Sequence, residues 1–159
     1  MSPFRQACEL ISFTAICFAV AWIGSVFTRP SIGNWYRGLR KPRWTPPGWL
    51  FGPVWTVLYL SMAIAAWLVY RHVGLSLAAV PLAVFGVQLT LNLAWSLIFF
   101  GRHDIGLAFI DIILLWLAIL ATIFAFRPIS IPAACLLVPY LVWVTFASAL
   151  NLSILRMNR

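Results

Sequence analysis

The sequence predicts an all-α integral membrane protein, a bundle of five transmembrane helices with an ordered first loop. Of the 159 residues, 64% are hydrophobic and only 9% are charged, whereas a soluble domain carries roughly 25% charged residues. Charged residues divide the chain into five apolar stretches of about 20 residues or more, the length that crosses a bilayer. Open strands would leave backbone groups unpaired in lipid, so the stretches are expected to be helices. This composition excludes a soluble enzyme and a disordered chain.

The chain is expected to form one membrane domain over residues 1–159. The first stretch also resembles a signal peptide, because Arg5 precedes an apolar run that contains Ala19-Val20-Ala21; we expect it to be retained as a helix. Pro132 and Pro139 are expected to kink or tilt the last helix. The predicted spans are 10–28, 49–70, 75–100, 105–126 and 129–155.

The loops between these spans differ in length and charge. Residues 71–74, 101–104 and 127–128 are expected to be tight turns, whereas the segment 29–48 is about twenty residues long. Eight basic residues fall on the side of this long loop and three on the other side. In a cytoplasmic membrane, the excess of positive charge predicts that the N-terminus lies outside and the C-terminus in the cytoplasm.

The long loop combines prolines, large aromatic residues and basic residues. Its aromatic side chains are Trp35, Tyr36 and Trp44, and prolines occupy positions 42, 46 and 47. Prolines restrict the backbone, and a flexible linker would be rich in Gly and Ser instead. We therefore expect an ordered cap that packs on the bundle; the alternative is an interfacial belt of aromatic residues.

Three of the predicted helices each carry an aromatic and polar face. Residues at helical spacing share a face, and amides avoid lipid, so these faces are expected to point inward. Together they predict either a flat pocket with aromatic walls or helix packing through interhelical hydrogen bonds. The faces consist of Trp55, Tyr59 and Met62; Gln88, Asn92, Trp95 and Phe99; and Tyr140, Trp143, Ala147, Leu150 and Asn151.

Residues suited to acid-base or metal chemistry are scarce. The chain has three acidic residues and two histidines, and none has the spacing of a catalytic pair or a metal site. Asp111 lies within the fourth span, where a carboxylate needs a hydrogen-bond partner or a proton; a proton relay is the alternative interpretation. No basic soluble module is present, so no nucleic-acid binding is expected, and the positive charge is assigned to contact with lipid head groups.

Several longer motifs resemble one known family. The loop reads Trp35-Tyr36-x-x-Leu39-x-Lys41-Pro42-x-Trp44-x-Pro46-Pro47-x-Trp49 and continues into Gly52-Pro53-Val54-Trp55. Gln88-Leu89-x-Leu91-Asn92-x-Ala94-Trp95 and Pro139-Tyr140-Leu141-x-Trp143 follow in the third and fifth spans. These motifs are similar to those of the tryptophan-rich sensory protein and translocator protein family, also known as the peripheral-type benzodiazepine receptors, in its bacterial form.

The resemblance implies a five-helix homodimer that binds porphyrins, such as protoporphyrin IX and haem, in a pocket under the first loop. It also implies binding of benzodiazepine-receptor drugs and of sterols, and a role in regulating or transporting tetrapyrroles. The fifth span lacks the tyrosine of the animal cholesterol motif, which argues against tight cholesterol binding. By motif match, the ligand-binding residues are Trp35, Tyr36, Trp55, Asn92, Trp95, Trp143, Phe146, Ala147 and Leu150.

An alternative activity that the resemblance implies is light-dependent oxidative degradation of bound protoporphyrin, with Trp55 and Trp143 as the photochemical candidates. The residues themselves suit a flat apolar macrocycle, since aromatic walls would stack on the ring. No obligatory cofactor or metal is expected, because no histidine lies inside a span to ligate haem iron. Four basic loop residues are predicted to meet the porphyrin carboxylates: Arg37, Arg40, Lys41 and Arg43.

A row of small residues on the third span suggests where a homodimer would form. Gly86, Thr90 and Ala94 recur every fourth residue, and such ridges let helices approach closely. The same ridge could instead pack inside one monomer.

Overall fold

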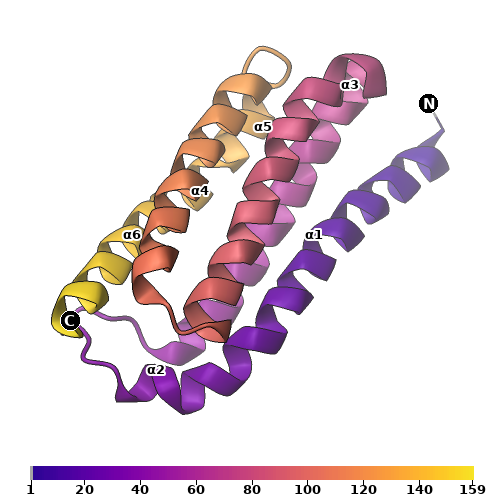
Figure 1. Cartoon of the computed structure of the whole chain (residues 1–159). Coiled ribbons are helices and arrows are strands. Elements are labelled where there is room, and N and C mark those ends of the chain that lie inside the picture. Colours follow the sequence, from indigo (N-terminus) through magenta and orange to yellow (C-terminus); the bar gives the residue numbers. More distant parts are fainter. Residues whose placement is uncertain (1) are drawn as a thin grey trace.

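The protein is an elongated helical bundle (Figure 1). The computed structural model describes residues 2–159, and every regular element in that range is a helix. One of these elements, η1, is a short π-helical turn that ends the long helix α3. In chain order the elements are α1 (Pro3–Gly33), α2 (Trp35–Gly38), α3 (Gly48–Ser96), η1 (Leu97–Gly101), α4 (Ile105–Phe126), α5 (Ile131–Leu136) and α6 (Val138–Met157).

Four helical stretches between residues 2 and 159 are long and apolar enough to cross a membrane. They are Pro3–Gly33, Gly48–Gly101, Ile105–Phe126 and Ile131–Met157. Many large apolar side chains point away from the bundle, among them Leu77 (71% exposed), Val80 (74%) and Phe124 (60%). So much exposed apolar surface on helices of this length belongs in lipid.

The second stretch is a hairpin, although its helical hydrogen bonding runs almost without a break. Gly74 alone departs from helical geometry, with φ 71° and ψ 174°, a conformation that only glycine adopts readily. Tyr59 binds Asn92 and Met62 contacts Gln88, so the two legs run antiparallel, as Figure 1 shows. The turn predicted at 71–74 is thus reduced to one glycine, and the helix includes Arg71–Val73.

The first helix is longer than predicted at both ends. It begins at Pro3, where Ser2 caps it by accepting a hydrogen bond from the Arg5 backbone N–H at 3.3 Å. It continues through Pro30 to Gly33, because a proline removes only one helical hydrogen bond and the last turn is anchored elsewhere. The anchor is Ser31, whose hydroxyl donates to the Phe100 carbonyl at 2.7 Å. The predicted loop 29–48 is therefore partly helical, and irregular backbone is confined to Asn34 and residues 39–47.

The remaining helices match the predicted spans with one break. Helix α4 covers Ile105–Phe126, as expected, with Asp104 as its cap. The last span is divided at Leu137, just before Pro139 in the first turn of α6, which confirms an interruption there. Pro132 does not kink a helix, because it lies in the first turn of α5, where its missing N–H costs nothing.

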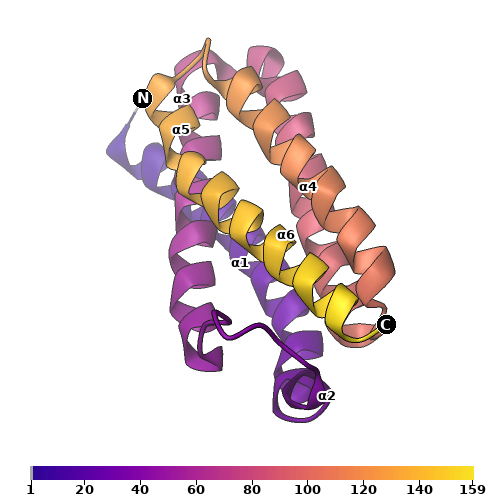
Figure 2. The ribbon, with the colours of Figure 1, turned by 90° about the vertical axis from the view of Figure 1, so that its left-hand side faces the viewer.

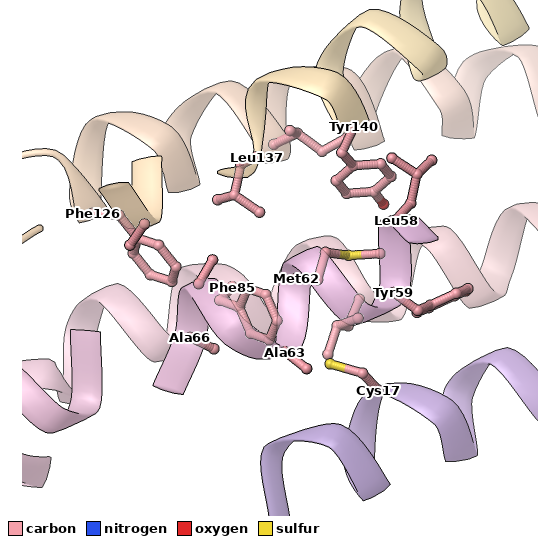
Figure 3. Packing of buried hydrophobic residues seen from close by; sticks show 14 of the residues in the cluster. Cys17, Leu58, Tyr59, Met62, Ala63, Ala66, Phe85, Phe126, Leu137 and Tyr140 are labelled. Carbon is pink, nitrogen blue, oxygen red and sulfur yellow. The ribbon is translucent and has the colours of Figure 1, made fainter. Parts of the chain in front are cut away.

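Small residues let the core helices pack closely. Ala63, Ala65 and Ala66 on the first leg of α3 are fully buried, so neighbouring backbones can approach. Figure 3 shows this cluster, in which Cys17 of α1, Met62 of α3 and Tyr140 of α6 meet between the helices. This core fills the half of the bundle that is remote from the first loop.

The two ends of the bundle differ. Figure 2 shows the first loop, α2 and the C-terminus at one end, and the N-terminus with α5 at the other. Asn158 joins the loop to the C-terminus, because its side chain accepts from the Arg40 N–H at 3.0 Å and donates to the Arg40 carbonyl at 2.8 Å. Trp44 packs edge-on against Phe146 of α6, with ring centroids 5.5 Å apart. The loop therefore lies across the end of the bundle, as predicted for an ordered cap.

Candidate ligand cavity

A cavity of about 750 Å³ lies in the loop half of the bundle. Its walls come from α1, from the beginning and end of α3, from η1 and from α6, and Tyr36 of α2 contributes from the loop. A volume of this size is typical of small-molecule sites, which are mostly apolar with a few polar groups. The cavity is therefore a candidate ligand site.

Seven of the nine predicted ligand-binding residues line this cavity: Tyr36, Trp55, Asn92, Trp95, Trp143, Ala147 and Leu150. They come from three elements, α2, both legs of α3 and α6, that are distant in sequence and meet only in the folded chain. The helix faces were predicted to point inward, and their most enclosed members confirm this direction: Asn92 is 3% exposed and Leu150 is 6% exposed.

The other two predicted residues lie outside the cavity wall. Trp35 stacks on His103 with ring centroids 4.2 Å apart and an interplanar angle of 16°. Phe146 packs between Trp143 and Trp44, with ring centroids 5.5 Å from each. Each of them packs against a residue that does line the cavity: Trp35 contacts the Phe99 ring, and Phe146 contacts the Trp143 ring.

The four residues predicted to contact porphyrin carboxylates also lie outside the wall, and that contact stays a prediction. Arg37, Arg40, Lys41 and Arg43 do not line the cavity. Lys41 is occupied within the loop, where its Nζ donates to the carbonyls of Tyr36 at 2.6 Å and Leu39 at 3.0 Å. It also lies 4.7 Å from the centre of the Tyr36 ring. The lysine holds the loop together.

Tyr36 is the loop residue that reaches the cavity. Its ring packs on Phe99 and Phe100, with centroids 6.2 and 5.8 Å away, and the residue is 9% exposed. This burial raises the pKa of the Tyr36 phenol, so the group remains neutral at physiological pH and keeps its proton for donation to a ligand.

Sequence reasoning missed the contribution of α1. Trp22, Ser25 and Arg29 of this helix line the cavity, although no site residue was predicted in the first span. The predicted first span, residues 10–28, carries no amide that could have indicated this role. One signal is Gly24, at which an added Cβ would lie 3.4 Å from the Ser96 hydroxyl; a glycine there permits close approach to α3.

Hydrogen-bonded side chains form one polar edge of the cavity. Asn92 accepts from the Tyr59 hydroxyl at 2.8 Å and donates to the Tyr140 hydroxyl at 2.6 Å. Asn151 accepts from the Trp95 indole N–H at 3.0 Å and donates to the Ile105 carbonyl at 3.1 Å. Both predicted interpretations of the inward faces therefore apply, because residues that line the cavity also join helices.

Some buried polar atoms have no partner among residues 2–159. Gln88 points inward as predicted, but its Nε2 contacts only the Met62 sulfur at 3.6 Å and its Oε1 is unpaired. Asp111 Oδ2 is likewise buried and unpaired, so the structure does not show the hydrogen bond predicted there. The indole N–H of Trp143 is also buried without a partner, although other atoms of this residue line the cavity.

The cavity opens between α1 and the beginning of α3. Lining residues on this side are exposed, Trp22 by 67% and Trp49 by 73%. The opposite wall is enclosed, since Tyr59 is 6% exposed and Phe99 2%. We refer below to this exposed side of the cavity, lined by α1 and the beginning of α3, as the mouth.

The fold and cavity together define an integral membrane helical bundle with an aromatic-walled internal cavity beneath a folded loop. Residues 13–157 match the model of the TspO/MBR family. The chain belongs to this family, as the motifs of the loop and of the third and fifth spans predict.

Relatives of the chain occur in bacteria and animals. It is 43% identical to the tryptophan-rich protein TspO of Chlorobaculum tepidum over 97% of this chain and 98% of the relative. It is 41% identical to the human translocator protein over 93% of this chain and 89% of the relative. It is also 38% identical to the tryptophan-rich sensory protein of Cereibacter sphaeroides, over 93% of this chain and 90% of the relative.

Proposed function

We propose that the protein is a membrane receptor or carrier that binds tetrapyrroles, such as protoporphyrin IX, and regulates their level or transport. The observation that carries this proposal is the cavity of about 750 Å³, whose lining includes Trp55, Trp95 and Trp143. Indole rings favour stacking on a flat aromatic macrocycle. Drugs of the benzodiazepine-receptor type and sterols are further apolar ligands of suitable size for the same space.

Binding is proposed to depend on the porphyrin ring and its carboxylates rather than on iron. The described residues that line the cavity include no histidine, cysteine or methionine, which are usual side chains on haem iron. Tyrosine is a further haem ligand, but the Tyr59 hydroxyl already donates to Asn92 and the buried Tyr36 phenol keeps its proton. We expect metal-free protoporphyrin and haem to bind with similar affinity. Much tighter binding of haem would show that an axial ligand contributes.

The experiment that tests the proposed function is a titration of detergent-purified protein with protoporphyrin, followed by tryptophan fluorescence. Saturable quenching near one porphyrin per chain, weakened in Trp143→Phe, supports a site in the cavity. Linear quenching that does not saturate and is indifferent to Trp143 would mean partition into the micelle and would contradict the proposal. Flux of porphyrin into sealed vesicles then separates a carrier from a receptor.

Light-dependent degradation of bound porphyrin is a second candidate function, because both tryptophans proposed for it, Trp55 and Trp143, line the same cavity. A porphyrin held there would be close to both indoles. Formation of a product that requires light and the protein, and that is lost in Trp143→Phe, would favour this activity. Product formation that is equal in the variant would exclude a role for Trp143.

We further propose that five helical segments cross the membrane, with the N-terminus outside. The break at Gly74 supports the count, since each leg of α3 is longer than the about 20 residues that a crossing needs. The orientation follows from the excess of basic residues at the loop end. A protease added to the medium should then cleave residues 37–43 in inverted vesicles, whose cytoplasmic face is outside, and spare them in intact cells. The reverse pattern would contradict the orientation.

A homodimer is proposed through the second leg of α3. An added Cβ at Gly86 would meet nothing within 4 Å, so this surface is open within the monomer and a neighbouring chain could approach it closely. Gly86→Leu should convert a dimer to a monomer in detergent, as measured by light scattering. A dimer that persists would place the interface elsewhere.

A further inference from the structure

The cavity has one charged residue in its described lining, Arg29 of α1. Its side chain is exposed, and no side chain or carbonyl among residues 2–159 forms an ion pair or hydrogen bond with its guanidinium. An unpaired guanidinium beside an apolar cavity offers five donors to an incoming anion.

No acidic residue neutralises this charge. Glu9 pairs with Arg5 at 3.0 Å, near the opposite end of α1. Asp104 accepts from the Leu107 N–H at the start of α4, and Asp111 is buried in α4. None of the three lines the cavity, so the potential at Arg29 favours negative charge.

The position of Arg29 along α1 places this charge at one end of the mouth. Trp22, Ser25 and Arg29 lie three and four residues apart and share one helix face. At 1.5 Å per residue, Arg29 lies about 10 Å from Trp22 in the direction of the loop. A ligand along this wall would therefore meet apolar rings first and a cation at the loop end.

We propose that Arg29 binds the carboxylate of an amphiphilic ligand whose flat apolar body lies in the cavity. This inference rests on the proposed function and deepens it, because the Arg29 guanidinium would select acids over neutral analogues of the same shape. It also replaces the four loop residues predicted for this role. Arg29 is thus a specificity residue for flat polycyclic acids, of which a porphyrin with propionate groups is an example.

The test compares protoporphyrin with its dimethyl ester, which keeps the ring and removes both charges. Each is titrated into wild type, Arg29→Gln and Arg37→Gln in neutral detergent, with tryptophan quenching as the readout. Arg37 is the matched control, because it is an exposed arginine of the same loop end that lies outside the cavity wall. Arg29→Lys is a fourth protein, which keeps the charge and loses the planar fork.

We expect Arg29→Gln to weaken binding of the acid about tenfold, the size of one hydrogen bond to a charged group. Binding of the ester should be unchanged, Arg37→Gln should resemble wild type, and Arg29→Lys should recover part of the affinity. Equal losses for acid and ester, or an equal effect of Arg37→Gln, would overturn the role of Arg29 while leaving the site intact. Absence of saturable binding in wild type would overturn the proposed function and this inference together.

An anionic lipid head group could reach the same guanidinium from the bilayer, and a further measurement separates the two sources. The titration is repeated with phosphatidylglycerol in the micelle. If the lipid and the ligand carboxylate compete for Arg29, the lipid should weaken binding of the acid but not of the ester, and only in proteins that retain Arg29. Acid binding to wild type that is unaffected by phosphatidylglycerol would show that head groups do not reach Arg29. Weakening of acid binding that is equal in Arg29→Gln would reflect general repulsion by the charged micelle and would count against the proposal.

Discussion

The Tyr59 hydroxyl donates a hydrogen bond of 2.8 Å to Asn92 Oδ1, joining residues 33 positions apart on the two legs of α3. The Asn92 amide nitrogen in turn donates a hydrogen bond of 2.6 Å to the Tyr140 hydroxyl of α6. All three side chains are at most 6% exposed. A single amide thus connects three helical segments directly beside the cavity.

Removing the Tyr59 hydroxyl, the first donor in this series of hydrogen bonds, should destabilise the protein. Tyr59→Phe leaves Asn92 Oδ1 buried without a donor, which costs about 1 kcal/mol in the free energy of unfolding. Thermal unfolding in detergent, followed by tryptophan fluorescence, should show a lower Tm. Ser76→Ala, at an exposed serine on the second leg of α3, is the control and should change Tm little. A Tyr59→Phe variant as stable as wild type would mean that the bond contributes nothing net.

Gly74 should be intolerant of a side chain. Its φ of 71° and ψ of 174° cost a non-glycine residue about 1–3 kcal/mol, although an added Cβ would meet nothing within 4 Å. We expect Gly74→Ala to lower Tm through backbone strain alone. The matched variant Gly33→Ala has equally open space on helical backbone at the end of α1 and should not be destabilising. Similar losses of Tm in both variants would refute the role of the turn geometry.

The contact of His103 with Trp35 should hold the first part of the loop in place. Ser31 gives its proton to the Phe100 carbonyl, which leaves its oxygen to accept from His103 Nε2 at 3.2 Å. His103 has a φ of 58°, which asparagine tolerates well. His103→Asn therefore removes the stacked ring without adding backbone strain.

We expect trypsin to cleave His103→Asn several-fold faster than wild type within residues 37–43, where arginines follow Trp35. His72→Asn is the control, because His72 lies near the turn at the opposite end of the bundle and bonds only to the Leu68 carbonyl of its own helix. Equal cleavage rates in the two variants would show that the loop is held without His103.

The sequence was sufficient to predict the helical class, the bounds of α4 and the aromatic and amide residues that α3 and α6 contribute to the cavity wall. These features follow from local patterns, namely long apolar runs and residues that recur at helical spacing. The turn at Gly74 was located to within four residues, but a continuous helix up to Val73 was not expected, because Arg71 and His72 suggested the end of a span.

The contribution of α1 could not be predicted from its own pattern. Arg29 lines the cavity because α1 continues as a helix past Pro30, and that extension depends on the long-range bond between Ser31 and Phe100. That Lys41 does not line the cavity could not be predicted for the same kind of reason, because its partners are the carbonyls that the folded loop turns toward it. Charge alone indicated basic residues near the site but not which of them face it.

The most direct test of the account is to fill the cavity from one wall and measure porphyrin binding. Ala147 lines the cavity, so Ala147→Phe should place a ring in the space that a bound porphyrin needs. Ala149, two residues further on the same helix, is exposed and lies outside the cavity wall, so Ala149→Phe is the matched control. We predict saturable protoporphyrin binding that is at least about tenfold weaker in Ala147→Phe and unchanged in Ala149→Phe. Equal affinity in both variants, with both proteins folded, would contradict a binding site inside the bundle.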